Sequence, residues 1–276
     1  MLWWLNSALG TLIRIIFLPL ASFHPWIAML VISLLTALLM LFVYKKTSDQ
    51  AGIKRAKERI KAHLLEIRLY QNDFRTQLNS QKELLAANLR YLSYNLKPLL
   101  VMIIPIFLLL AQLNLWFGYR IPAKDETFLL KVRFLKSVDL MKLNLEVETP
   151  EGLQLETPPV RIIDEAEVSW RLRVTGVTGK PVIITVDGER YLKSIPATNR
   201  SLTRVSPVRV RKNLWQELLH PGEKPLPADS LLTRVELVLP ESRLEFAGIS
   251  FHWLVAYFLL SIIFGFTLKG VFRVEI

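Results

Sequence analysis

Cysteine is absent from the 276-residue sequence, which excludes disulfide frameworks, thiolate zinc sites and cysteine nucleophiles. Histidine is rare as well, and its four occurrences fall in four different segments without the spacing of metal ligands. The sequence also lacks a nucleophile elbow, a glycine-rich phosphate loop and a paired-histidine motif. We therefore expect no catalytic residues, no metal site and no cofactor, and we do not expect an enzyme.

Apolar residues, in contrast, are abundant. They make up 51% of the chain and the mean hydropathy is +0.32, which argues against a purely soluble protein. Three runs carry no charged residue, and at 1.5 Å per residue each can cross a hydrocarbon core of about 30 Å as a helix. We predict transmembrane helices over residues 26–44, 98–118 and 249–268, with the lipid bilayer as a partner.

The net charge of +11 is concentrated between the first two of these runs, where segment 45–97 holds twelve basic and five acidic residues. The positive-inside rule places this segment in the cytoplasm. The N-terminus and residues 119–248 then lie outside, and the tail 269–276 returns to the cytoplasm. We expect an integral protein of a prokaryotic inner (cytoplasmic) membrane.

Residues 1–25 precede the first predicted span and are amphipathic. This pattern is typical of a helix that lies in the membrane interface. In the alternative, residues 2–20 enter the bilayer and bury Arg14. The polar face holds Asn6, Ser7, Gly10, Thr11 and Arg14, and the apolar face holds Leu5, Leu9, Leu12, Ile13, Ile16 and Phe17.

Segment 45–97 indicates two helices joined by a turn at residues 71–73. Apolar residues recur every seven positions on both sides of this turn, as they do in helices that pack as an antiparallel pair. The sequence therefore predicts a helical hairpin on the cytoplasmic side. The recurring residues are Ile53, Ile60 and Ile67 in the first arm and Leu78, Leu85, Leu92 and Leu99 in the second.

The first arm of this hairpin carries a dense group of basic side chains. They are candidates for contact with anionic lipid headgroups, a ribosome or a nascent chain. The alternative is a self-packed coiled coil with a solvated basic surface that serves as a spacer or for self-association. We expect no specific nucleic-acid recognition. The candidate contacts are Lys54, Arg55, Lys57, Arg59 and Lys61.

Region 119–248 changes from helical patterns to short β-rich runs. Asp187 and Gly188 stand between two such runs and are a strong hairpin-turn signal. About seven strands in some 125 residues favour an antiparallel β-sandwich of immunoglobulin-like type outside the membrane. Trp170 is expected to anchor its core, and Asn213–Leu219 to form a short helix. The overall fold class is thus an α+β membrane protein.

The first span ends in "TALLMLFVYKKTSDQ", a basic hairpin follows, and the second span reads "NLKPLLVMIIPIFLLLAQLNLWF". In this order of elements the chain resembles the YidC/Oxa insertase superfamily. It is most similar to the three-span members, namely the archaeal YidC-like proteins and the insertase subunit of the endoplasmic reticulum membrane protein complex. The resemblance covers residues 1–120 and the last span. It implies insertion or folding of nascent membrane proteins, with nascent chains or the ribosome as partners.

The resemblance also implies a polar intramembrane groove, which lowers the cost of moving hydrophilic segments across hydrocarbon. Bacterial members carry a groove arginine in a run that resembles "TLIRIIFLPL", which here contains Arg14. This chain departs from them because a complete span separates that run from the hairpin, and from the three-span members because of its large external region. The candidate groove-lining residues are Arg14, Ser33, Thr36, Gln112 and Asn114.

Two functions follow as hypotheses. In the first, the protein is an insertase or chaperone-like factor for membrane proteins. In the second, it is a non-catalytic scaffold or sensor that displays a β-sandwich outside and a coiled coil inside. Both leave open the simpler reading of the groove residues, because Ser and Thr in membrane helices usually bond their own backbone or a neighbouring helix.

Overall fold

The computed structural model describes residues 3–70, 73–195, 202–246 and 248–275. The protein is α+β and forms two compact units. The β-rich unit comprises Met1–Ala28 and Leu108–Ala256. The helical unit comprises Met29–Phe107 and Tyr257–Ile276.

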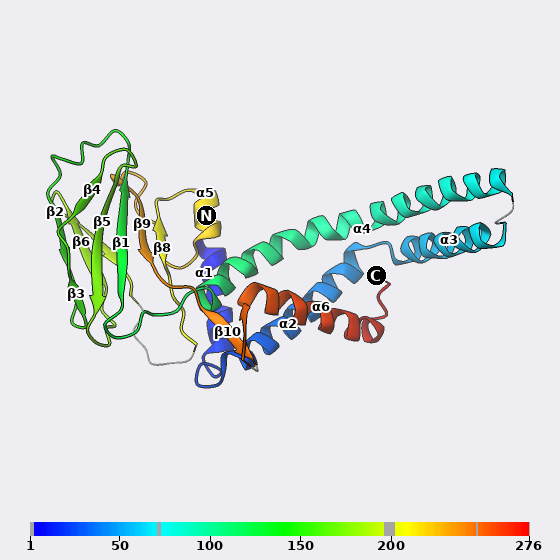
Figure 1. The fold of residues 1–276 in the computed structure, drawn as a ribbon, viewed down its shortest axis with the longest axis horizontal. Helices are drawn as coiled ribbons and strands as arrows, with labels where there is room; N and C mark the ends of the chain where they lie inside the picture. Colours follow the sequence, from blue (N-terminus) through cyan, green and yellow to red (C-terminus); the bar gives the residue numbers. More distant parts are fainter. Residues whose placement is uncertain (1–2, 71–72, 196–201, 247, 276) are drawn as a thin grey trace. The chain divides into compact units, whose positions relative to one another are not determined.

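Three helices are long and apolar enough to cross a membrane, so this part of the prediction is confirmed. They are α2 (Pro25–Thr47), α4 (Phe74–Phe117) and α6 (Trp253–Phe272), and each contributes to both units (Figure 1). Helix α4 passes through Pro98 and Pro105 without a break. The second arm of the hairpin and the second apolar run are therefore one helix.

The third apolar helix begins later than residue 249. Ile249–His252 forms strand β11, which pairs antiparallel with β10 (Arg243–Phe246), and α6 starts only at Trp253. The ring of Trp26 packs on that of Phe246, with centroids 5.5 Å apart. Backbone pairing with β10 thus prevails over helix formation in a stretch whose apolar composition suits either.

The strands of the β-rich unit form antiparallel sheets. The largest has the order β3-β5-β1-β9-β8, with β4 also paired to β5, and a second has the order β2-β6-β7. The strands are β1 (Thr127–Phe134), β2 (Leu145–Glu148), β3 (Leu153–Leu155), β4 (Val160–Ile162), β5 (Glu167–Val174), β6 (Val182–Val186), β7 (Glu189–Lys193), β8 (Val208–Val210) and β9 (Leu232–Val238).

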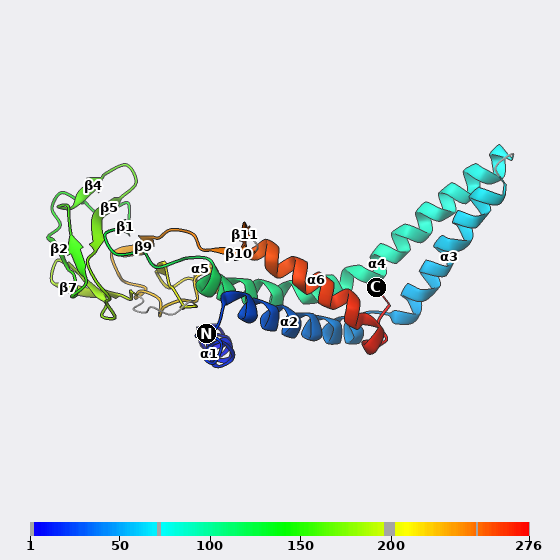
Figure 2. The same ribbon diagram turned by 60° about the horizontal axis from the view of Figure 1, so that its bottom comes forward.

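These two sheets share one hydrophobic core. They form two layers in Figure 2, with β2 and β7 in one layer and β5 and β1 in the other. Every second residue of β1 from Phe128 to Phe134 is at most 5% exposed, and Val182 and Ile184 of the other sheet are fully buried. Trp170 is 2% exposed in this core, which confirms its predicted place.

The connections that the sequence marked most clearly are present. Asp187 and Gly188 have φ values of 48° and 89° between the paired residues Val186 and Glu189, as a tight two-residue hairpin requires. Helix α5 (Leu214–Leu219) begins after its capping residue, Asn213.

Helix α1 (Trp3–Phe17) packs within the β-rich unit through an unexpected face. Asn6 is 1% exposed and Gly10 is buried, although the sequence pattern placed both on the outward polar side. Ile13 and Phe17 share this buried face, and the Phe17 ring lies 5.1 Å from that of Trp116, centroid to centroid. Steric fit explains the difference, because a small residue at position 10 lets α4 approach closely.

The hairpin consists of α3 (Gln50–Leu69) and the first part of α4, which lie side by side and antiparallel in Figures 1 and 2. Asp49 caps α3 by accepting a 2.9 Å hydrogen bond from the Gly52 N–H. Asp73 caps α4 by accepting from the Arg75 N–H at 3.1 Å. The remainder of the predicted turn, residues 71 and 72, lies outside the described residues.

The predicted apolar seam is correct for α3 at Ile53, which is fully buried, but wrong for α4. The side of α4 that meets α3 instead carries another set of residues seven positions apart, Ser80, Ala87 and Tyr94. The small side chains of Ser80 and Ala87 allow α3 and α4 to approach closely, and the leucines face outward. The outward leucines are Leu78, Leu85, Leu92 and Leu99, which are 43%, 63%, 60% and 51% exposed.

Candidate functional site

A cavity of about 280 Å³ lies among the three long apolar helices of the helical unit. Side chains of α2, α4 and α6 all contribute to its wall, and most of them are aliphatic or aromatic. Small residues at Ala37 and Gly265 leave the space that larger side chains would fill. The lining residues are Thr36, Ala37, Met40, Leu41 and Tyr44 of α2, Met102 and Ile106 of α4, and Tyr257, Phe258, Ser261, Ile262 and Gly265 of α6.

The few polar atoms near this cavity differ in their hydrogen bonding. Thr36 lines the cavity, but its hydroxyl donates to the Ile32 carbonyl oxygen at 2.7 Å and so bonds its own helix. Ser33, about one turn earlier, is fully buried, and its hydroxyl has no partner among the described residues. The buried Ser261 hydroxyl interacts with the side chain of Tyr257. The cavity is therefore mainly apolar, with the Ser33 hydroxyl as the one group near it that has no partner among the described residues, rather than the polar groove that the resemblance implied.

Three of the predicted groove residues, Arg14, Gln112 and Asn114, belong to the β-rich unit rather than to the helical unit. Gln112 is fully buried, and its side-chain amide donates to the Asn6 carbonyl oxygen at 2.9 Å. The Asn6 side chain in turn donates to the Glu217 carbonyl oxygen at 2.7 Å. These bonds join α1, α4 and α5. Asn114 is half-buried near the end of α4, and its carbonyl oxygen accepts from the Gly118 N–H at 2.9 Å.

Arg14 is exposed near the end of α1. Its positive charge acts on Arg204, which donates to the Pro221 carbonyl oxygen at 3.1 Å. Burial, and then the charge of Arg14, lower the pKa of the Arg204 guanidinium. Arg14 therefore lies near a second cation, and the carboxylate of Glu223 partly offsets the positive charge around Arg204.

The basic residues of α3 form a surface that is open to partners. Lys54, Arg55, Arg59 and Lys61 are exposed, and none of them forms an ion pair with the residues that the structure describes. Lys57 differs, because its ammonium lies 3.3 Å from a carboxylate oxygen of Glu275. Four of the five predicted contacts are therefore available, and the fifth is engaged within the helical unit.

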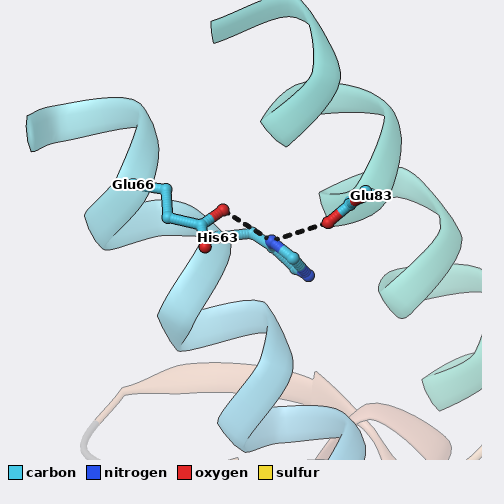
Figure 3. A group of neighbouring side chains, drawn as sticks. All are labelled: His63, Glu66 and Glu83. Atoms are coloured by element: carbon cyan, nitrogen blue, oxygen red, sulfur yellow. Dashed lines mark hydrogen bonds and ion pairs between the residues drawn. The ribbon is translucent and has the colours of Figure 1, made fainter. Parts of the chain in front are cut away.

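Side chains from both arms of the hairpin meet at His63 (Figure 3). Its Nδ1 lies 2.9 Å from Glu66 Oε2 on α3 and 3.5 Å from Glu83 Oε2 on α4. The hydrogen bond with His63 lowers the pKa of the Glu66 carboxyl, and Ser80 donates to that carboxylate at 3.2 Å. The contacts of His63 with carboxylates on both helices hold α3 against α4.

The same three side chains could also offer a metal one nitrogen and two oxygen ligands, all within 4.8 Å of one another. Within the described ranges, no other group of histidine and acidic residues has this geometry. Sequence reasoning missed the group because it considered the spacing of histidines alone. The hydrogen bonds account for the arrangement without an ion.

One buried ion pair lies in the β-rich unit. The Lys193 side chain is fully buried, donates to the Ser206 carbonyl oxygen at 2.6 Å and pairs with the Glu223 carboxylate. Burial lowers the pKa of Lys193 despite this carboxylate. The pair connects β7 to the segment after α5, so its role is structural.

Comparisons with known proteins give no family: no family model, no curated protein and no solved structure matches this chain.

Proposed function

We propose that this chain is an integral membrane protein of the YidC/Oxa type that helps nascent membrane proteins insert or fold, without enzymatic chemistry. The observation that carries the proposal is the cavity among α2, α4 and α6, because these are the three helices with the length and apolarity of membrane spans. A bundle without internal space would offer an incoming segment nothing to occupy.

The surfaces of these helices support a membrane placement. Large apolar side chains of α6, such as Leu259, Ile263 and Phe266, are between 52% and 57% exposed. Such a surface is stable in hydrocarbon and unfavourable in water. With the positive-inside rule, the hairpin and the C-terminal tail lie in the cytoplasm and the N-terminus lies outside, as in a prokaryotic inner membrane. The β-rich unit then displays its sheets outside, as an immunoglobulin-like sandwich.

The cavity suggests how a client would be held. Its aliphatic wall suits an apolar segment that has begun to leave water. The Ser33 hydroxyl lacks a partner among the described residues, so a polar group on that segment could satisfy it. Meeting such a group matters, because an unsatisfied one in hydrocarbon costs several kcal/mol. The exposed basic residues of α3 would attract anionic headgroups, a ribosome or a nascent chain.

A second function is favoured by a specific observation. The outward leucines of α4 include Leu85, Leu89 and Leu92, spaced four and three apart, and all are at least 59% exposed. This is the spacing of a coiled-coil seam. A second copy of the chain could cover it, and the protein would then act as a scaffold or sensor through self-association.

Site-specific photo-crosslinking distinguishes these functions. Ile262 lines the cavity, whereas the neighbouring Ile263 does not, and their exposures are similar at 52% and 57%. A photo-crosslinking amino acid at position 262 should capture nascent membrane chains, while the same group at position 263 should capture mainly lipid. Equal capture at both positions would refute the insertase proposal. Capture of only other copies of the chain from position 85 would favour the scaffold.

A further inference from the structure

The β-rich unit contains a second cavity, of about 350 Å³, at one end of its shared core. Phe128 at the start of β1, Val174 at the end of β5 and Leu237 near the end of β9 all line it. The antiparallel register brings these strand ends together. The volume lies within the range of about 300–1,000 Å³ that is usual for small-molecule sites.

The wall of this cavity is apolar apart from two side chains at separate positions. Thr178 is only 9% exposed, and its hydroxyl is buried without a hydrogen-bond partner in the part of the chain that the structure describes. A buried hydroxyl without a partner is unfavourable, so a polar group bound beside it would satisfy it. Lys124 is exposed and forms no ion pair with the described residues, so its charge is available.

This combination matches an amphiphile better than a peptide. A bound peptide strand needs a row of backbone partners along the edge of a sheet. Here the lining comes from strand ends and from the segments 121–124 and 176–178. One apolar space lined by a single ammonium and a single hydroxyl fits one aliphatic chain with one polar head.

The cavity also lies close in sequence to the end of α4. That helix ends at Phe117, and the lining begins at Ile121. The segment before β1 and the segment after β9 lie side by side at this end of the unit, because the Arg120 N–H donates to the Pro240 carbonyl oxygen at 3.0 Å. If α4 spans the bilayer, as the proposed function holds, this end of the sheets meets the headgroup region. The source of an acyl chain is then at hand.

We infer that this cavity binds the aliphatic chain of a lipid or fatty acid, with the polar head at Lys124 and Thr178. The inference rests on the proposed function only for the membrane placement. It does not require insertion activity.

The test uses the full-length protein in polymer-bounded nanodiscs without detergent, together with a fatty acid that carries a diazirine near the end of its acyl chain. After irradiation, mass spectrometry locates the label. We expect saturable labelling within residues 121–128 and 174–178. A labelled phospholipid in a nanodisc forms a second arm, and labelling in that arm alone identifies the bilayer as the source.

Variants decide whether the label reports this cavity. Val177 lines it and is 68% exposed, so Val177→Trp should block the space with little effect on folding. Thr178→Val and Lys124→Gln should each weaken labelling about threefold to tenfold at a subsaturating concentration. Matched controls from the same surface, Thr175→Val and Lys180→Gln, are exposed and do not line the cavity, so they should leave labelling unchanged.

The inference is overturned if Val177→Trp folds, as judged by its unfolding midpoint, and is still labelled like the parent chain. Labelling confined to α2, α4 and α6 in both arms would overturn it as well, and so would stronger labelling of the same residues by an apolar diazirine peptide. Insertion by Val177→Trp is measured in parallel. If Val177→Trp loses lipid labelling but keeps insertion, the result supports the cavity and leaves the proposed function in place. If the parent chain is labelled but does not promote insertion, the cavity stands and the proposed function alone is refuted.

Discussion

The β-rich unit and the helical unit treat their most apolar side chains in opposite ways. In β1, every second residue from Phe128 onward is buried in a core shared by two sheets. In the hairpin, the regularly spaced leucines of α4 face outward, with Leu85 63% exposed. The comparison shows that the spacing of apolar residues identifies one face of a helix or strand. Whether that face is buried depends on which other segment packs against it. The β-rich unit supplies its own neighbour in the second sheet, whereas the leucine face of α4 remains exposed.

The largest effect should come from the core of the β-rich unit. Trp170→Ala should lower the free energy of unfolding of this unit by about 4 kcal/mol, because it removes a large side chain from a packed interior. Denaturant titration followed by circular dichroism in the β-sheet region measures this. The control Trp215→Ala removes a ring that is 72% exposed and should stay within about 0.5 kcal/mol of the parent. Equal losses in both variants would contradict the assigned core.

A charge comparison should give the next effect. Lys193→Ala leaves Glu223 without its buried partner and should cost about 3 kcal/mol. Lys61→Ala removes an exposed hairpin charge and should change stability by less than about 0.5 kcal/mol. The same denaturant titration measures the free energy of unfolding of Lys193→Ala. Hydrogen exchange of the α3 amides measures the stability of Lys61→Ala. The contrast fails if Lys193→Ala behaves like Lys61→Ala.

Within the hairpin, the inward and outward faces should separate by about 2 kcal/mol. Ile53→Ala creates a cavity at a fully buried position and should lower the opening free energy of α3 by that amount. Leu85→Ala should leave the same quantity unchanged within about 0.5 kcal/mol, because the side chain is exposed. Hydrogen exchange of the α3 amides reports both. Greater loss of protection in Leu85→Ala would restore the leucines as the seam.

The smallest effect concerns pH. Burial, and then the charge of Arg234, lower the pKa of His220 below its usual value. Below about pH 6.5, His220 of the unfolded chain binds a proton that His220 of the folded β-rich unit does not bind. The free energy of unfolding therefore decreases as pH falls toward the lowered pKa of His220, by at most about 1.4 kcal/mol per pH unit. Unfolding midpoints between pH 7.5 and about 5 measure this slope. His220→Asn should flatten it, whereas His252→Asn should keep it.

Local signals in the sequence were sufficient for much of the fold. The left-handed pair Asp187 and Gly188 could be recognised because few residues adopt that conformation, and Trp170 because a large ring among alternating residues has to be buried. The three apolar helices follow from length and composition. These features depend on neighbours in sequence, so a single chain reveals them.

Features that depend on the fit between distant segments could not be predicted. Asn6 was assigned to an outward face, yet it meets Gln112 and Glu217, which are 106 and 211 residues away. Strand β11 was read as helix because its partner β10 decides the outcome. Of the candidate groove residues, only Thr36 lines the cavity of the helical unit, while Ser33 is buried nearby on the same helix. The cavity itself depends on two small residues of different helices, Ala37 and Gly265, which both line it.

The base of the hairpin depends on residues that are synthesised much later. The Glu275 N–H donates to the Gln50 side chain at 2.6 Å, across 225 positions of sequence, and Val274 packs in the cluster that contains Ile53. A ribosome that has finished α3 and α4 has therefore not yet produced the segment that closes them. During translation, the first turns of α3 remain uncovered until residues 274 and 275 arrive. Chain elongation thus sets when this part of the hairpin can become ordered.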